Sequence, residues 1–497
     1  MDLLSHSKNR LFLTPVVFVA LLVALFSVAT VPPVRAVTVW LRWVLPFAIG
    51  VWALMVAAQS RGLPRCFLKS DVLACAFIGL ALFSSLYSID PRTTLLRSFS
   101  VLLIYGAVFW GLWLYVDLGS SEKMVQTMLT AGTLALSLHL LALVLSPSRA
   151  LYYDNVRFVG WAENPGAVGS MAALYMPLAL WNFLSSRRWY NLTIVGAMML
   201  VIVLAHTRTE AIAMVVGSGY FLLRALPSKR SLVIAMGAAY ILVFISWSLV
   251  SPGLYKRSAY ELPEGLLDKV EQQMQLDTDQ LDTDQLDIEQ LDTEQRDIEQ
   301  LDTQQALLET INGQQPLEAM DTTKDTTVEQ EEWYLLDNHR YSRFELGTLG
   351  LRAQKWTRGI TYMLERPLLG FGFGTEDQLF AYHGWEEVEW IYTGGYIHNS
   401  YLGLALQVGI PGALLFFLPL VFLVVREVSQ GVQRNYTGVR VAILGVVLAG
   451  MTSALLSSWV YSMGNPNSLQ FWLCVMLLVR FRAQADVEVD GVRDVAQ

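Results

Sequence analysis

Long apolar runs, separated by short polar links, occur along most of the chain. Each run is about 17 to 25 residues long, which is the length that an α-helix needs to cross a hydrocarbon layer of roughly 30 Å. The alternation typical of an outer-membrane barrel is absent, so helices must satisfy the backbone within the lipid. The pattern predicts an all-α polytopic membrane protein with about twelve transmembrane helices, over residues 11–31, 37–59, 72–89, 98–117, 124–146, 165–184, 190–206, 209–226, 230–250, 399–425, 438–460 and 468–483.

The composition agrees with this pattern. Of the 497 residues, 54% are hydrophobic and 16% are charged, and the mean hydropathy is +0.41. A single soluble core does not require so many apolar residues. The first run is longer than the core of a signal peptide and has no A-x-A cleavage site, so we expect it to remain as the first span.

Lysine and arginine residues are unevenly divided between the two sets of alternating links. Most of them fall in the links that are cytoplasmic when the N-terminus is cytoplasmic, which predicts that both termini lie in the cytoplasm. The one long loop, about residues 251–397, then lies on the external, periplasmic side of the cytoplasmic (inner) membrane. Arg157 and Arg208, in separate short links, and His398, at the membrane end of the long loop, are expected on the same side.

The predicted spans and links divide the chain into five parts. They are the first five helices at 1–150, helices six to nine at 151–250, the large external loop at 251–397, the last three helices at 398–483 and a cytoplasmic tail at 484–497.

An acidic repeat of period five, beginning QLDTDQLDTDQLDIEQ, occupies residues 275–304 of the long loop. In a helix, its leucines would spiral around the axis, and in a strand, they would alternate between the two faces. Neither a helix nor a strand would therefore have an apolar face to bury. We interpret the repeat as a solvated, largely disordered insertion. A calcium-binding or adhesive array, or a short β-solenoid, is the alternative interpretation.

Three arginines on the predicted external side have the chemistry to bind an anion. Arg157 lies among aromatic residues in YYDNVRFVGW, and Arg208 lies in AHTRTEA between two spans. Arg352, in the long loop, falls on one face of a predicted helix with Trp356. The planar fork of arginine matches phosphate or carboxylate. Each arginine alone could instead anchor lipid headgroups or pair with a nearby acid, the candidates being Asp154, Glu163 and Glu210.

His398 lies where a glycine-rich loop meets the next apolar run, in GGYIHNSYLGLALQVGIPG. Imidazole, with an ordinary pKa near 6.5, can take a proton from a hydroxyl group at neutral pH, so this residue is a candidate general base. The alternative is a local role at a helix start, where Asn399 or Ser400 would cap the helix. Structural roles are expected for the other histidines considered, His139, His206, His339 and His383.

The sequence lacks the motifs of zinc proteases, serine hydrolases and ATPases. The sequence contains no H-E-x-x-H, G-x-S-x-G or Walker motif, and the three cysteines are widely spaced. We therefore expect no metal site and no cofactor. Membrane lipids are expected partners, and nucleic acid is not.

The order of four short motifs resembles the O-antigen ligase and O-antigen polymerase superfamily, which includes bacterial protein O-oligosaccharyltransferases. The motifs are R-x-x-G…N-P from Arg157, T-R-T around Arg208, R-x-x-x-W…P-L-L-G-F-G-F-G from Arg352, and H-N-S-Y-L…G-I-P-G from His398. The resemblance covers roughly residues 150–460. The sequence departs from the family pattern at Gln407, where relatives often carry an acid, and at Gly166, where a second asparagine is common.

The resemblance implies a GT-C-like architecture and an inverting glycosyltransferase of cell-envelope polysaccharide or lipopolysaccharide biosynthesis. Such an enzyme transfers a glycan from an undecaprenyl-diphosphate carrier to a glycan, lipid or protein acceptor, without a metal or a nucleotide sugar. It also implies that His398 activates the acceptor hydroxyl, that Arg157 and Arg208 hold the donor diphosphate, and that Arg352 is a further arginine of that site.

Other functions remain open at this point. About twelve spans are common in transporters, and some members of the superfamily are described as bicarbonate transporters. However, the sequence shows no repeat of its two halves, and the candidate groups gather at one face rather than at mid-membrane. An adhesin would rest only on the acidic repeat. The choice between ligase and polymerase depends on the acceptor, which the sequence does not identify.

Overall fold

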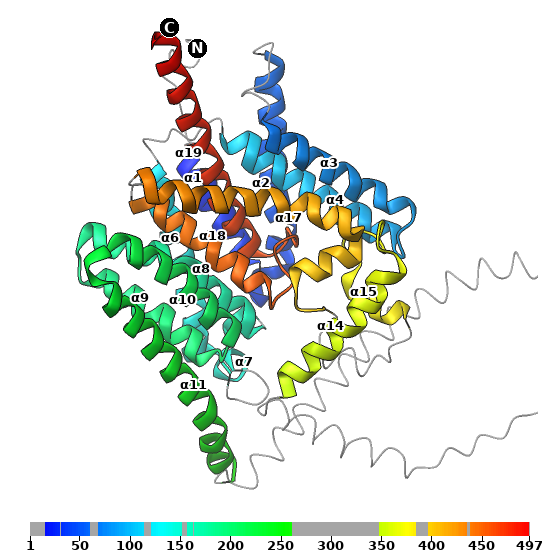
Figure 1. The fold of residues 1–497 in the computed structure, drawn as a ribbon. Coiled ribbons are helices and arrows are strands. Elements are labelled where there is room, and N and C mark those ends of the chain that lie inside the picture. Colours follow the sequence, from blue (N-terminus) through cyan, green and yellow to red (C-terminus); the bar gives the residue numbers. More distant parts are fainter. Residues whose placement is uncertain are drawn as a thin grey trace, which may run out of the picture. The chain divides into compact units, whose positions relative to one another are not determined.

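The computed structural model describes residues 15–29, 31–59, 68–113, 121–151, 157–162, 164–260, 347–383, 396–434 and 438–496 (Figure 1). The chain divides into two compact units, one of residues Met1–Val250 with Thr348–Gln497 and the other of residues Ser251–Gly347. The acidic repeat at 275–304, His339, Asp154 and Glu163 lie outside the described residues. All the contacts discussed below belong to the first unit.

Helices make up the described regular structure, apart from one isolated bridge between Leu151 and Phe158. In the first half they are α1 (Pro15–Val28), α2 (Pro32–Gln59), α3 (Lys69–Phe83), α4 (Pro91–Tyr105), the π-helical η3 (Gly106–Leu112), α6 (Ser121–Leu145), α7 (Pro147–Ala150), α8 (Pro165–Ser186), α9 (Tyr190–Leu204), α10 (Arg208–Ala225) and α11 (Arg230–Tyr260). Short 3-10 turns cover Ser84–Leu86, Gly160–Ala162 and Pro227–Lys229. In the second half they are α14 (Gly347–Glu365), α15 (Glu376–Tyr382), α17 (Ser400–Arg434), α18 (Gly438–Ala454) and α19 (Pro466–Ala496).

A helix occupies each of the twelve predicted spans. Seven helices in the described ranges are long and apolar enough to cross a membrane, namely Val34–Gln59, Lys69–Leu86, Pro91–Leu112, Ser121–Leu145, Pro165–Ser186, Pro227–Ser246 and Ser400–Gln430. Shorter apolar helices cover Val17–Val28, Tyr190–Leu204 and Gly438–Ala454. The predicted class, an all-α polytopic membrane protein, is confirmed, and the number of about twelve spans stays a prediction.

Polar residues followed by proline start two of the helices. Asp90 accepts a hydrogen bond from the amide of Thr93 at 3.0 Å, with Pro91 as the first residue of α4. Asn164 accepts one from the amide of Gly166 at 2.8 Å, with Pro165 as the first residue of α8. In each case the side chain accepts from an amide of the first helical turn, which has no carbonyl partner within the helix. Proline suits the first helical position because it has no amide hydrogen that would need a partner. Gly166, a position that departs from the family pattern, thus belongs to a helix cap.

Small residues let α10 and α18 pack closely. A Cβ atom added to Gly217 in α10 would collide with the carbonyl of Gly445 in α18, and one added to Gly445 would approach the carbonyl of Gly217. Within lipid, close backbone packing of this kind holds helices together because burial of apolar groups from water contributes little. This contact fixes α10, whose first residue is Arg208.

The helix α17 is broken at Gly409, which has φ 73° and ψ 171°. The amide of Ile410 donates to the carbonyl of Pro367 at 2.8 Å. The carbonyls of Leu406 and Gln407 accept from the amides of Phe371 and Gly372, at 3.0 and 2.8 Å. The span predicted over 399–425 therefore contains a break, where the glycine-rich turn before α15 supplies the missing backbone partners.

Candidate functional site

Arg208 stands at the start of α10, after a tight turn from α9. His206 in this turn has φ 51°, in the left-handed region. Thr207, Thr209 and Glu210 are buried, whereas the side chain of Arg208 is exposed. Glu210 accepts a hydrogen bond from Ser453 Oγ of α18 at 3.0 Å, which anchors the turn to the helix bundle.

The structure brings Arg352 of α14 to this turn. Its Nη1 donates to Thr209 Oγ1 at 3.4 Å. Burial lowers the pKa of Arg352, the charge of Glu210 opposes this shift, and the charge of Arg208 lowers the pKa further. Arginine stays protonated at neutral pH, so two of the predicted arginines hold their positive charges within electrostatic range of each other.

Arg157 approaches the same turn from another segment. Its Nε donates to the carbonyl of Ala205 at 3.3 Å, and the amide of Phe158 donates to the carbonyl of Leu204 at 3.0 Å. The link that carries Arg157 therefore lies along the end of α9, directly before Arg208. The two short external links of the prediction are thus adjacent.

His398 lies immediately before α17, and its backbone has φ 53°. The predicted cap role belongs to Asn399, whose Oδ1 accepts from the amides of Tyr401 and Leu402, both at 3.0 Å. Ile397, on the other side of His398, is fully buried, and its carbonyl accepts from Trp356 Nε1 at 2.9 Å.

Helix α14 connects the arginine turn to the His398 turn. Arg352 and Trp356 are one helical turn apart and share a face, as predicted. Arg352 contacts Thr209, and Trp356 holds the carbonyl of Ile397. One face of one helix therefore touches both segments that carry the candidate chemistry.

The sequence reasoning missed Glu376, the first residue of α15. Its side chain is buried and accepts hydrogen bonds from the amide of Ile397 at 2.8 Å, from Ser458 Oγ at 2.8 Å, from Gln407 Nε2 at 3.3 Å and from the hydroxyl of Tyr461. Burial raises the pKa of Glu376, and the hydrogen bonds from Tyr461, Ser458 and Ile397 oppose the shift without cancelling it. Gln407, the second departure from the family pattern, is thus a partner of a buried carboxylate.

An available signal was the glycine-rich run that precedes Glu376. Gly370, Gly372 and Gly374 have φ of 71°, 111° and 85°, which other residues rarely adopt. Their backbones approach Gln407, Ser88 and Arg97 so closely that a Cβ atom would collide. An acidic residue directly after such a run is expected to lie in closely packed surroundings. This makes it a candidate for a structural or functional contact.

Two other histidines have packing contacts that fit the expected structural roles. His139 is buried in α6, and its Nδ1 accepts from the amide of Trp161 at 3.2 Å. The ring of His383 stacks on Tyr362 with centroids 3.8 Å apart. Within the described ranges, no group of three or more His, Cys, Asp and Glu side chains is placed to hold a metal ion.

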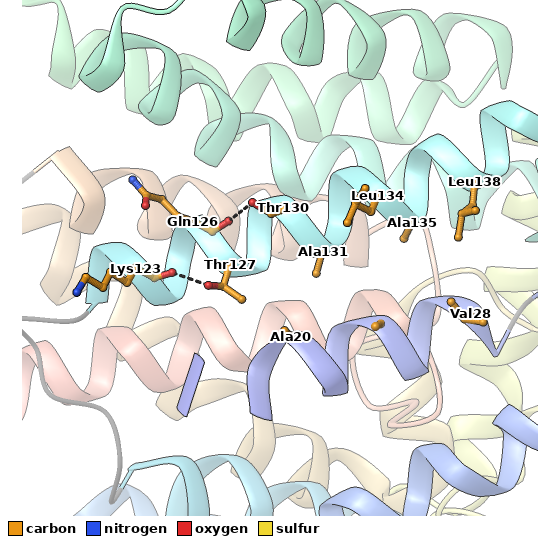
Figure 2. A pocket seen from close by; sticks show the side chains of 11 residues that line it. Ala20, Val28, Lys123, Gln126, Thr127, Thr130, Ala131, Leu134, Ala135 and Leu138 are labelled. Atoms are coloured by element: carbon orange, nitrogen blue, oxygen red, sulfur yellow. Dashed lines mark hydrogen bonds between the residues drawn. The ribbon is translucent and has the colours of Figure 1, made fainter. Parts of the chain in front are cut away.

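An open groove of about 640 Å³ lies between α1 and α6, away from these segments in the chain (Figure 2). Its walls carry small and aliphatic residues, among them Ala20, Val28 and Leu138, with Lys123 at one end. The hydroxyls of Thr127 and Thr130 donate to carbonyls of their own helix, both at 2.8 Å. None of the candidate site residues lines this groove.

Comparison with known proteins adds to this geometry. A family model described as O-antigen ligase matches residues 192–417, a segment that includes Arg208, Arg352, Glu376 and His398 and begins after Arg157. No curated protein matches the chain. The family match supports an O-antigen ligase- or polymerase-like function and a glycosyltransferase-like activity with lipid-linked glycans, and nothing found supports the transporter alternative. The chain is thus a multi-pass membrane protein in which residues 192–417, a little less than half of its length, are similar to the O-antigen ligase family.

Proposed function

We propose that this protein is an inverting glycosyltransferase that moves a glycan from an undecaprenyl-diphosphate carrier to a hydroxyl group of an acceptor. His398 is the general base, and Arg157, Arg208 and Arg352 hold the donor diphosphate. The reaction takes place at the external face of the cytoplasmic membrane, with both termini in the cytoplasm. The acceptor is a glycan, a lipid or a protein.

The observation that carries the proposal is the connection made by α14. Arg352 lies beside Arg208 and bonds to Thr209, while Trp356, one turn later, bonds to the residue before His398. Cations and a candidate base that are far apart in sequence are therefore supported by the same helix. A transferase needs this pairing, because the base and the leaving group must act on the same substrate.

The arginine turn has the properties of a diphosphate site. Arg208 and Arg352 repel each other, and an anion between them removes the repulsion. Arg208 is also the first residue of an 18-residue helix, whose N-terminus carries partial positive charge. Arg157 adds a third guanidinium from the neighbouring link.

The reaction follows from these roles. His398 takes the proton of the acceptor hydroxyl as its oxygen forms a bond to the anomeric carbon of the glycan. The bond between that carbon and the diphosphate oxygen breaks, and its electron pair leaves with the lipid diphosphate. The arginines stabilise the negative charge where it develops. Attack opposite the leaving group inverts the anomeric configuration.

The test begins with deletion of the gene in its host and examination of lipid-linked and surface glycans. The wild-type gene should restore the glycan profile, and the His398→Ala and Arg208→Ala variants should not. His383→Ala and Arg92→Ala serve as matched controls, because His383 packs on Tyr362 and Arg92 is an exposed arginine of α4. An unchanged glycan profile after deletion contradicts the transferase function, and full restoration by His398→Ala contradicts the assignment of the base.

A further inference from the structure

We infer that Glu376 is a positioning residue, which holds His398 in the orientation that a general base needs. The inference rests on the proposed function, because it gives Glu376 its task through His398. Glu376 itself does not touch the substrate in this scheme.

One oxygen of Glu376 anchors the chain on both sides of His398. The amide of Ile397, the residue before, donates to Oε1 at 2.8 Å. Ser458 Oγ donates to the same oxygen at 2.8 Å and accepts from the amide of Asn399, the residue after, at 3.1 Å. The two backbone amides that flank His398 are thus tied, one directly and one through a hydroxyl, to a single carboxylate oxygen.

His398 needs such anchors because its backbone conformation is unfavourable. At φ 53° the Cβ atom of a non-glycine residue crowds the neighbouring carbonyl, and an isolated chain would relax to negative φ. That rotation would turn the imidazole away from its present direction. Local strain of this kind persists where the surrounding structure over-determines it.

The carboxylate is itself fixed in place. Its second oxygen, Oε2, accepts from the hydroxyl of Tyr461 and from Gln407 Nε2, and Gln407 Oε1 accepts from the amide of Gly374 at 2.6 Å. Four donors therefore converge on the two oxygens of a side chain that is 1% exposed. An ionised carboxylate offers acceptors at both oxygens, whereas an amide offers only one oxygen. Glutamine at this position cannot satisfy the same four donors.

The next residue in α15 provides a matched control. Asp377 has the same charge and lies on the same short helix, but its carboxylate oxygens bond to Arg97. Replacement of Asp377 by asparagine removes a charge beside Glu376 without breaking the bonds to Ile397 and Ser458.

The experiment measures transfer by the purified full-length protein, with undecaprenyl-diphosphate-linked glycan and acceptor isolated from host membranes. We expect Glu376→Gln to lower kcat by about 10- to 100-fold, because small displacements of a catalytic group have effects of this size. The KM for the donor should change by less than about twofold, since the arginines lie on other segments. Asp377→Asn should keep kcat within about threefold of the wild type. A normal kcat for Glu376→Gln, or an equal loss for Asp377→Asn, overturns the inference.

A second variant covers the case in which Glu376→Gln does not fold. Ser458→Ala removes the hydroxyl that bonds to Glu376 and to the amide of Asn399, and it leaves the bond from Ile397 intact. Its kcat should therefore fall by about 3- to 10-fold at unchanged donor KM. Full kcat for Ser458→Ala then overturns the inference. The experiment also separates this inference from the proposed function. If His398→Ala is as active as the wild type, the assignment of the general base fails. If His398→Ala is inactive but Glu376→Gln and Ser458→Ala are fully active, only the positioning role of Glu376 fails.

Discussion

Arg97 and Asp377 are 280 positions apart in the sequence and form a two-point ion pair, with Nη1–Oδ1 and Nη2–Oδ2 distances of 3.0 and 2.7 Å. Arg97 Nη1 also donates to the carbonyl of Gly374. Helix α4 is thereby attached to the glycine-rich turn that leads to Glu376. Helix α4 precedes the matched segment 192–417, so a helix outside that segment contacts the turn before Glu376.

The first prediction concerns this ion pair. Solvent weakens the attraction because the side chains of Arg97 and Asp377 are 40% and 22% exposed, so we expect a coupling free energy of about 1 kcal/mol or less. A double-mutant cycle with Arg97→Ala and Asp377→Ala, followed by thermal unfolding in detergent, measures it. Strictly additive losses of stability would show that the pair contributes nothing.

The second prediction concerns the buried pair of Glu427 in α17 and Arg440 in α18. Arg440 Nε and Nη2 donate to the two oxygens of Glu427 at 3.0 and 2.9 Å, and both side chains are almost fully buried. Glu427→Ala leaves a buried guanidinium without its partner and should lower the free energy of unfolding by about 3–5 kcal/mol. The thermal midpoint of the purified protein reports the loss. Combined replacement of both residues by methionine should recover most of it, and a smaller loss for Glu427→Ala alone than for the double variant would contradict the prediction.

The third prediction concerns the contact between α10 and α18. Gly217→Ala places a methyl group against the Gly445 carbonyl and Ala449, so the helices must separate, at a cost of about 1–3 kcal/mol. Gly219→Ala is the matched control, because a Cβ atom there meets nothing within 4 Å. Thermal unfolding should show a lower midpoint for Gly217→Ala and an equal or higher midpoint for Gly219→Ala. Equal behaviour of the two variants would mean that α10 and α18 are not in close contact.

The fourth prediction concerns pH. Burial raises the pKa of Glu376 above its ordinary value, so the folded protein binds more protons at this position than the unfolded chain. Stability from this group is present below the ordinary pKa of about 4.3 and decreases as the pH rises through the folded pKa. Glu376→Gln cannot titrate, so the thermal midpoint of the wild type minus that of the variant should become smaller as the pH rises from about 4. An increase of this difference with pH would show that the folded pKa is lowered instead.

Features that depend on neighbours in the sequence were predictable. The caps formed by Asn399 and by Asp90 with Pro91 involve residues two or three positions apart. The apolar runs predicted a helix at each of the twelve spans but not the short helices α7 and α15. Arg157 and Arg208 were chosen as candidates because arginine is unusual at a membrane boundary, and Arg352 because it shares a helix face with Trp356. Glu376 was not found, because its partners Ile397 and Tyr461 are 21 and 85 positions away. An acid in a loop is ordinary until the fold surrounds it.

The break at Gly409 was missed for a related reason. An apolar run shows that a segment is buried in lipid, but it does not show whether the helix within it is continuous. The break depends on backbone bonds to Pro367, Phe371 and Gly372, which come from a different part of the chain. Such pairing leaves no periodic trace in either segment.

The same break limits how parts of this protein can be exchanged with those of relatives. The turn at 367–372 and the first half of α17 complete each other's backbone hydrogen bonds, so a graft that carries only one of them leaves the amides of Phe371, Gly372 and Ile410 without these partners. A chimera that replaces the long loop should therefore keep its junction upstream of Pro367. Residues 367–372 and 406–410 should be exchanged together, although the sequence divides them between a loop and an apolar helix.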